Sequence, residues 1–139
     1  MNRNRRTRRI PPAAWFILSA LLLAGCAAEP GFEDIGVRRT AELLAANRYN
    51  PDFAVIDVRS PREFAAGRIP GAVNISIHDP AFRDRLEELD REAAYLVYCR
   101  TGIRSRSAGR VLGELGFREV YHLRPGIRGW QAEEREVER

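Results

Sequence analysis

The stretch "AYLVYCRTGIRS", Ala94 to Ser105, decides the fold of this chain. Its first half is short, apolar and rich in β-branched and aromatic residues, which predicts a buried strand from Ala94 to Cys99. The residues from Ser105 to Gly116 predict a helix that ends at glycine. Because a short loop joins the two, a buried strand passes directly into a helix, and this is the building unit of an α/β fold.

The same alternation of strands and helices extends on both sides of this stretch. The pattern predicts a helix over Val37–Arg48, a strand over Phe53–Val58, a short helix after Ser60, a strand over Ala72–Ile77, a charged surface helix over Ala81–Glu92, a strand over Glu119–Leu123 and a terminal helix from Gly129 that frays. We therefore expect an α/β fold with a mainly parallel central sheet flanked by helices.

The residues after the predicted strand over Phe53–Val58 carry the signals of a helix start. Ser60 is a favoured N-cap, Pro61 suits the first helical position, and Glu63 completes a capping box with Ser60. Gly67 then ends the helix. We predict a single short helix between the cap and this glycine.

The positive charge of the chain is concentrated in its first residues. All 23 basic residues are arginines, five of them lie within the first nine positions, and no acid precedes Glu29. Without residues 1–25, 18 arginines face 19 acids, so the formal charge falls from +4 to −1. The high isoelectric point therefore belongs to this leader, and it gives no reason to expect a nucleic-acid partner.

The leader has the three parts of a secretory signal: a basic start, the apolar run Ala13–Ala24, and small residues before Cys26. The apolar run is short for a permanent membrane span. The join Leu23–Cys26, "LAGC", resembles the lipobox of bacterial lipoproteins, in which the cysteine is lipidated and becomes the first mature residue. We expect a signal peptide at residues 1–25, a lipid-anchored tether at 26–33 and one folded domain at 34–139. An uncleaved anchor or an ordinary signal peptide remains the alternative.

This interpretation sets a location. A lipidated Cys26 would hold the domain on a membrane of the cell envelope, at the periplasmic face if the cell has two membranes. Cys99 would then be the only thiol of the mature chain, with no cysteine left for a disulfide. A lone cysteine is often a small buried apolar side chain. The residues after Cys99 point to chemistry instead.

Cys99 ends the predicted strand at the edge where parallel sheets form their sites. The following loop presents backbone N–H groups and the positive end of a helix dipole, and Arg100 and Arg104 add positive charge. Such surroundings favour the thiolate. Asp57 ends a neighbouring predicted strand, and we expect it to pair with Arg59 and brace the loop, with proton transfer by Asp57 as the alternative.

Two chemistries use a cysteine in an anion-holding loop, and the spacing separates them. Cysteine phosphatases resemble the pattern C-x5-R, usually with histidine before the cysteine. Here Arg104 follows Cys99 in a C-x4-R spacing, and Tyr98 stands in place of the histidine. The loop is one residue too short for the phosphatase pattern.

Three motifs in order resemble the rhodanese family of sulfurtransferases, of the single-domain type. They are "DVRSPREFAAGRIPGAVNI" (Asp57–Ile75), "VYCRTGIRS" (Val97–Ser105) and "LRPGIRGW" (Leu123–Trp130), and the resemblance runs from about Asp34 to Gln131. It implies the rhodanese-like three-layer fold. The chain departs from the family pattern at Arg68, where histidine is frequent, and at Pro125, where glycine is usual. We expect the proline to alter the turn under the loop.

The resemblance also implies a mechanism and its residues. The Cys99 thiolate would take sulfur from a donor such as thiosulfate and pass it, as a persulfide, to a thiol or to cyanide. The cradle and donor-binding residues would be Arg100, Thr101, Gly102, Ile103, Arg104 and Ser105, with Asp57 and Arg59 supporting them. We expect no cofactor and no metal. His78 and His122 are interpreted as a surface residue and a satisfied strand residue, because no metal-ligand spacing is present.

Two other functions remain open from the sequence. One is a rhodanese-like binding or sulfur-carrier module whose cysteine serves a protein partner in the cell envelope. The other is phosphatase or arsenate-reductase chemistry, which the loop length disfavours.

Overall fold

The computed structural model of the chain describes residues 31–139. The predicted signal peptide (1–25), Cys26 and most of the predicted tether lie outside the described residues. Within residues 31–139, no helix combines the length and the hydropathy that a membrane span requires.

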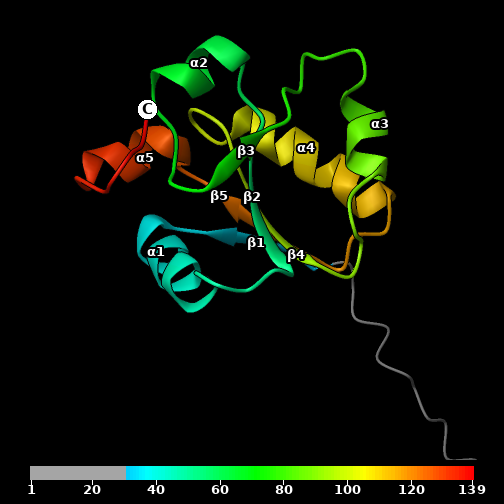
Figure 1. Cartoon of the computed structure of the whole chain (residues 1–139), viewed down its shortest axis with the longest axis horizontal. Helices are drawn as coiled ribbons and strands as arrows, with labels where there is room; N and C mark the ends of the chain where they lie inside the picture. The colour runs from blue at the N-terminus through cyan, green and yellow to red at the C-terminus, as the bar shows by residue number, and fades with distance from the viewer. Residues whose placement is uncertain (1–30) are drawn as a thin grey trace, which may run out of the picture.

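Five strands and five helices alternate along the described chain (Figure 1). In order they are β1 (Gly31–Ile35), α1 (Val37–Ala46), β2 (Phe53–Asp57), α2 (Pro61–Ala66), β3 (Ala72–Asn74), α3 (Phe82–Glu87), β4 (Ala94–Tyr98), α4 (Ile103–Glu114), β5 (Glu119–Leu123) and α5 (Gly126–Ala132). The strands form one sheet in the order β1-β5-β4-β2-β3, and every pair is parallel. The predicted α/β class with a parallel sheet is confirmed.

The sheet lies between two layers of helices, and each face has its own core (Figure 1). On one face Val97 and Cys99 pack with residues of α3 and α4. On the other face Leu96 and Tyr98 pack with residues of α1 and α5. Side chains alternate along a strand, so β4 contributes to both cores, and the apolar run that predicted it reflects burial on two sides.

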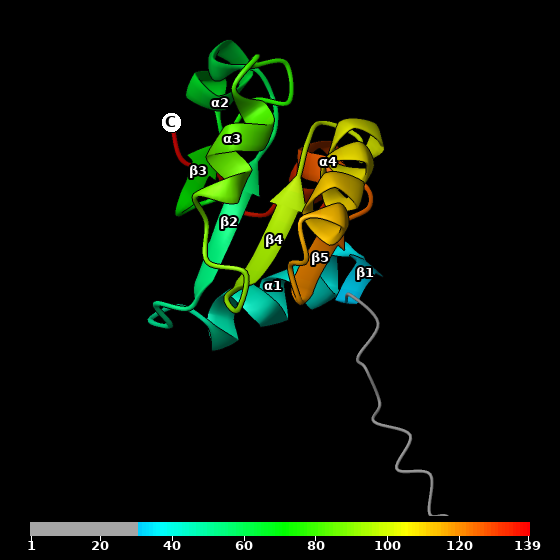
Figure 2. The ribbon, with the colours of Figure 1, turned by 90° about the vertical axis from the view of Figure 1, so that its right-hand side faces the viewer.

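β4 is the middle strand of the sheet, with β5 and β1 on one side and β2 and β3 on the other (Figure 2). The chain order switches direction between β4 and β2, since β5 follows β4 in sequence while β2 precedes it. Loops at the carboxyl ends of the strands beside such a switch form the usual binding crevice of an open parallel sheet. The loop after β4 therefore occupies the position that the sequence predicted.

The prediction of a tether at residues 26–33 was wrong for residues 31–33, because β1 begins at Gly31. This edge strand pairs along its whole length with β5, from Gly31 opposite Glu119 to Ile35 opposite Leu123. Its only large apolar side chains are Phe32 and Ile35, so the sequence lacks the apolar run of a central strand. The folded unit therefore includes residues 31–33.

The predicted terminal helix was also wrong in its extent. α5 ends at Ala132, and the chain then turns, with Glu134 at a positive φ of 56°. The indole N–H of Trp130 donates to the backbone oxygen of Glu136 at 2.7 Å. Glu138 then forms a β-bridge with Arg68. Because these contacts engage the tail, it runs back across the molecule instead of continuing as a helix.

Candidate active site

Cys99 follows directly after β4 and is buried, with 1% of its surface exposed. Its neighbour Tyr98 points to the opposite face, where its hydroxyl oxygen accepts a hydrogen bond from the backbone N–H of Ile69 at 3.1 Å. Burial raises the pKa of Tyr98 far above its ordinary value. Tyr98 is thus a structural residue of the second core, and it does not face the sulfur.

The loop after Cys99 curls its donors around the sulfur. The backbone N–H of Gly102 donates to Sγ at 3.1 Å, and the hydroxyl of Ser105 donates to Sγ at 3.4 Å. Burial raises the pKa of the Cys99 thiol. The hydroxyl of Ser105 and the backbone N–H groups of Ser105, Thr101 and Gly102 act against burial, and the net effect is a lowered pKa. The surroundings therefore favour the thiolate, which is the reactive form of cysteine.

Two glycines give the loop its shape. Gly102 has a φ of +93°, and a Cβ there would overlap the carbonyl oxygen of Arg124. Gly126 has a φ of +62°, and a Cβ there would approach the carbonyl oxygens of Cys99 and Arg100 to about 2.6 and 2.5 Å. Only glycine allows such approaches without backbone movement.

The start of α5 holds the floor of this loop. The backbone N–H of Ile127 donates to the oxygen of Cys99 at 2.9 Å, and that of Arg128 donates to the oxygen of Arg100 at 3.1 Å. Pro125, the departure that the sequence singled out, is the N-cap of α5, with a φ of −79°. The C-terminal motif therefore contributes to the site by fixing the backbone of the loop.

Arg104 is held by a residue of α2. Its guanidinium donates to the two carboxylate oxygens of Glu63, each at 2.8 Å. Ser60 and Glu63 form the predicted capping box of α2, and this fixes the carboxylate. The pKa of Glu63 is lowered to about 2, first by Arg104 and, against burial, by Ser60. The pKa of Arg104 is raised, mainly by Glu63 and in smaller part by the Cys99 sulfur.

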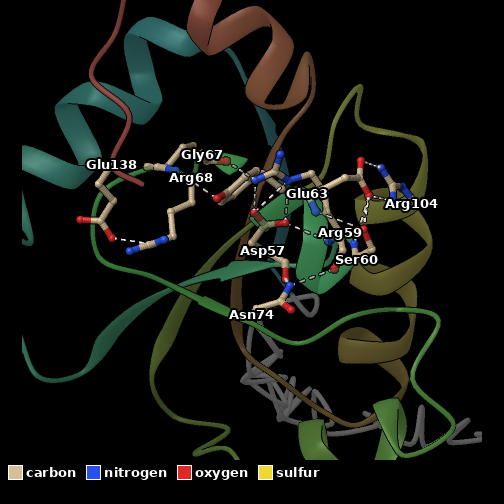
Figure 3. A network of polar contacts seen from close by, with 11 residues as sticks. Asp57, Arg59, Ser60, Glu63, Gly67, Arg68, Asn74, Arg104 and Glu138 are labelled. Atoms are coloured by element: carbon tan, nitrogen blue, oxygen red, sulfur yellow. Dashed lines mark hydrogen bonds and ion pairs between the residues drawn. The ribbon is translucent and has the colours of Figure 1, made fainter. Parts of the chain in front are cut away.

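Asp57 and Arg59 form the predicted pair beneath this rim (Figure 3). The guanidinium of Arg59 donates to Asp57 Oδ2 at 2.6 Å and to the backbone oxygen of Gly67 at 2.6 Å. The side-chain amide of Asn74 donates to the backbone oxygens of Asp57 and Arg59, each at 2.9 Å. Both members of the pair are buried, and their contacts join the end of β2 to Gly67 at the end of α2.

Arg68, the other departure from the family pattern, joins this network to the C-terminal tail (Figure 3). Its Nε donates to Glu138 at 2.8 Å, and its guanidinium lies over the ring of Phe64 at 4.7 Å. The two backbones also exchange hydrogen bonds, at 2.9 and 3.0 Å. Arginine at this position therefore ties the tail to the end of α2.

The remaining predicted loop residues are exposed. Arg100 and Thr101 point to the surface, and Ile103, the first residue of α4, is 76% exposed. Thr101, Gly102 and Ile103 border a depression of about 340 Å³ beside the loop, whose other lining residues are Arg106, Ser107, Arg110, His122 and Arg124. Three of these lining residues are arginines, so positive charge lies beside the cysteine loop.

His122 is a residue of the site that the sequence interpretation assigned to the strand alone. It is fully buried on β5, and its Nε2 lies 2.9 Å from Ser105 Oγ and 3.0 Å from the oxygen of Gly102. Its Nδ1 lies 2.7 Å from Asp34 Oδ1. Asp34 is 88 residues away in sequence, so spacing offers no signal of this contact. Within residues 31–139, no three His, Cys, Asp or Glu side chains gather in a way that suits a metal ion.

Comparison with known proteins gives a consistent result. Residues 40–133 match the Rhodanese-like domain family. The "Thiosulfate sulfurtransferase GlpE" of Pseudoalteromonas translucida is 33% identical over 101 residues, which cover 73% of this chain and 90% of the relative. The "Sulfurtransferase" of Allochromatium vinosum is 35% identical over 79 residues, 57% of this chain and 72% of the relative. The crystal structure of a rhodanese-related protein from Thermoplasma volcanium is 30% identical with a TM-score of 0.63, covering 76% of this chain and 97% of that one.

Proposed function

This chain belongs to the rhodanese-like family, and from that premise we propose that it is a sulfurtransferase in which Cys99 carries the transferred sulfur as a persulfide. The observation that supports this most strongly is the setting of the sulfur. Backbone and hydroxyl donors surround Cys99 Sγ and lower the pKa of its thiol in spite of burial. The same donors suit a persulfide anion, whose charge lies one sulfur further out.

The first half-reaction uses thiosulfate as the donor. The Cys99 thiolate attacks the outer sulfur, an S–S bond forms to Cys99, and the bond from that sulfur to the sulfonate sulfur breaks. Sulfite leaves with the electron pair, so a thiolate and a thiosulfate dianion give a persulfide anion and a sulfite dianion. Charge and atoms balance, and no external oxidant or reductant is required.

The second half-reaction returns the enzyme to its starting state. An acceptor nucleophile, such as a small thiol or cyanide, attacks the outer sulfur of the persulfide. Cyanide leaves as thiocyanate, and Cys99 is released as the thiolate. The two steps share one covalent intermediate, so the kinetics are ping-pong.

Arginines at the rim supply the binding energy for an anionic donor. Arg104 would bind the sulfonate through the edge that Glu63 leaves free, and exposed Arg100 would add a second positive charge. The N–H groups of the loop and the hydroxyl of Ser105 would hold the reacting sulfur. The roles proposed for Thr101, Gly102 and Ile103 are those of backbone, since they form the curve of the cradle.

The test is the rate of thiocyanate formation from thiosulfate and cyanide by the purified full chain. We expect parallel lines in double-reciprocal plots, the sign of a ping-pong cycle. Cys99→Ser should reduce the rate to that of the uncatalysed reaction, while the matched control Cys26→Ser should retain it. A Cys99→Ser chain that keeps the activity would overturn the proposal.

The same preparation separates the two alternatives. A chain that forms no thiocyanate, yet accepts sulfur from a persulfidated protein, would act as a carrier for a protein partner. Hydrolysis of an aryl phosphate by the wild type and not by Cys99→Ser would indicate phosphatase chemistry.

We further propose that the chain is a lipoprotein of the cell envelope, anchored through Cys26 and facing the periplasm in a cell with two membranes. The support is the basic start, the apolar run and the "LAGC" join. Labelling cells with a fatty-acid analogue should mark the wild type and leave Cys26→Ser unmarked. Equal labelling of both would contradict the anchor.

A further inference from the structure

His122 connects an edge strand of the sheet to the cysteine loop. Its ring is fully buried and stacks on Phe32, with centroids 5.4 Å apart and planes 19° apart. One ring nitrogen faces Asp34 on β1, and the other faces Gly102 and Ser105 in the loop. Ser105 is itself a donor to the Cys99 sulfur. A continuous line of hydrogen bonds therefore runs from Asp34 through His122 and Ser105 to Cys99.

The hydrogen-bond partners of the His122 ring determine whether one or both of its nitrogens should carry a proton. Nδ1 lies 2.7 Å from Asp34 Oδ1, and the hydrogen bond from His122 lowers the pKa of that carboxyl, with Arg106 acting in the same direction against burial. A carboxylate only accepts, so Nδ1 must donate. Nε2 lies 3.0 Å from the carbonyl oxygen of Gly102, which also only accepts. Both contacts are favourable when the ring carries a proton on each nitrogen.

The ring proton on Nε2 decides where the single hydroxyl proton of Ser105 goes. Three groups compete for this proton: the Cys99 sulfur at 3.4 Å, the oxygen of Gly102 at 3.2 Å and Nε2 at 2.9 Å. When Nε2 carries a proton, it donates and leaves the hydroxyl proton to the other two. When Nε2 is bare, it is the nearest acceptor and draws the hydroxyl proton away from the sulfur.

We propose that His122 is a positioning residue for sulfur transfer: the doubly protonated ring, held by Asp34, turns the hydroxyl proton of Ser105 onto the sulfur of Cys99. This inference rests on the proposed function, because it assigns a role within the same site. Loss of the ring proton reverses the hydroxyl and removes one donor from the thiolate and from the persulfide. The cysteine thereby responds to the protonation of a side chain that it does not contact.

Other charges also face this ring. Asp34 lies on β1, and Arg106, which pairs with Asp34, lies on α4. Arg110 on α4 and Arg124 after β5 line the same depression as His122. To assign a change in Cys99 reactivity to His122, the ring must therefore be substituted while these other charged residues are kept.

The experiment is the rate of Cys99 alkylation by iodoacetamide as a function of pH, in the full chain carrying Cys26→Ser. His122→Leu removes the donor, and we expect Cys99 to react about tenfold more slowly below neutral pH, the usual worth of one hydrogen bond to a charged group. His122→Gln places an amide donor near Nε2 at every pH, so it should restore most of the rate. The exposed histidine offers the control His78→Gln, which should leave the profile unchanged.

A cycle with Ser105→Ala separates positioning from packing. If His122 acts through Ser105, His122→Leu should slow alkylation no further once the hydroxyl is gone. If the ring serves only to pack the loop, the rate reductions caused by His122→Leu and Ser105→Ala should multiply. His122→Gln should then slow alkylation as much as His122→Leu does. Either of those results would overturn the proposal.

The ring nitrogens give an independent test if the leucine variant fails to fold. Nitrogen-15 spectra of the wild type, recorded at the pH where wild type and His122→Leu differ most in alkylation rate, should show a proton on both ring nitrogens of His122. A neutral ring with a bare Nε2 would contradict the assignment. Neither measurement uses a sulfur donor, so the two failures are distinguishable: a failed thiocyanate assay with an intact His122 effect would remove sulfur transfer and leave only the control of Cys99 reactivity by His122.

Discussion

The cysteine loop is held from two sides, and the two sides are built differently. The α2 flank, which consists of Asp57, Arg59, Glu63 and Arg104, contains two ion pairs. The β5 flank, which consists of Asp34, His122 and Ser105, is a line of hydrogen bonds that ends at the Cys99 sulfur. We infer that the α2 flank mainly sets the shape of the rim and the β5 flank mainly sets the state of the sulfur. Stability and reactivity should therefore respond to different substitutions.

The largest loss of stability should follow from breaking the buried pair of the α2 flank. Arg59→Ala leaves the carboxylate of Asp57, which is fully buried, without its guanidinium. Loss of one member of a buried ion pair costs about 3–5 kcal/mol. We expect a fall of that size in the free energy of unfolding, measured with urea. The neighbouring exposed arginine gives the control Arg62→Ala, which should change it little. Comparable stability of the two variants would contradict the bracing role.

The β5 flank should show the opposite balance. Ser105→Ala removes the hydroxyl that donates to Cys99 Sγ. We expect the pKa of the Cys99 thiol to rise by about one unit, the worth of one hydrogen bond to a charged group. Thiolate absorbance against pH measures this rise, in a chain carrying Cys26→Ser. An unchanged titration, with a loss of stability as large as that of Arg59→Ala, would abolish the distinction between the flanks.

Glu63→Gln should have a smaller effect that depends on pH. The pKa of Glu63 is lowered from 4.5 to about 2 in the folded chain. A lowered folded-state pKa stabilises above the unfolded value, and this contribution is lost as the pH falls from 4.5 toward 2. The pair is partly exposed, so its worth is on the order of 1 kcal/mol. We expect the variant to be less stable than the wild type at pH 7 and nearly equal near pH 2, by thermal melting. An equal difference in stability between the two chains at both pH values would contradict the role of the Glu63 carboxylate.

The smallest effect should come from the link between α2 and the tail. Glu138→Gln weakens the contact with Arg68, which is partly exposed, and such pairs contribute about 0–1 kcal/mol. The backbone hydrogen bonds of the bridge remain. Hydrogen exchange at the amide of Arg68 should quicken slightly, with Glu136→Gln as the matched control. A loss of stability as large as that of Glu63→Gln would mean that the tail contributes as much as the α2 flank does.

The sequence was most informative where neighbours along the chain determine the structure. Ser60 and Glu63 are three residues apart, and their capping box was predictable from that spacing. Cys99 follows a buried run, so its place at the edge of the sheet followed from the parallel topology. Gly102 was predictable as a residue of positive φ because the loop between strand and helix is so short.

Contacts between residues far apart in the sequence could not be predicted from local sequence patterns. The pairing of Glu63 with Arg104 spans 41 residues, and that of Asp34 with His122 spans 88. β1 is an edge strand with a single neighbour, so it needs few apolar residues and resembled a tether. The tail reads as helical, but its backbone finds partners in Arg68 and Trp130 instead. In each case tertiary contact overrides local preference.

The most direct test of the account is the intact mass of the full chain with Cys26→Ser, recorded after thiosulfate and again after cyanide. We predict a gain of one sulfur atom on Cys99 that cyanide removes as thiocyanate. Oxidation to sulfinic acid adds nearly the same mass, but it would resist cyanide. A chain whose Cys99 thiol can be titrated, yet gains no sulfur removable by cyanide, would contradict the claim that this cysteine carries sulfur from thiosulfate.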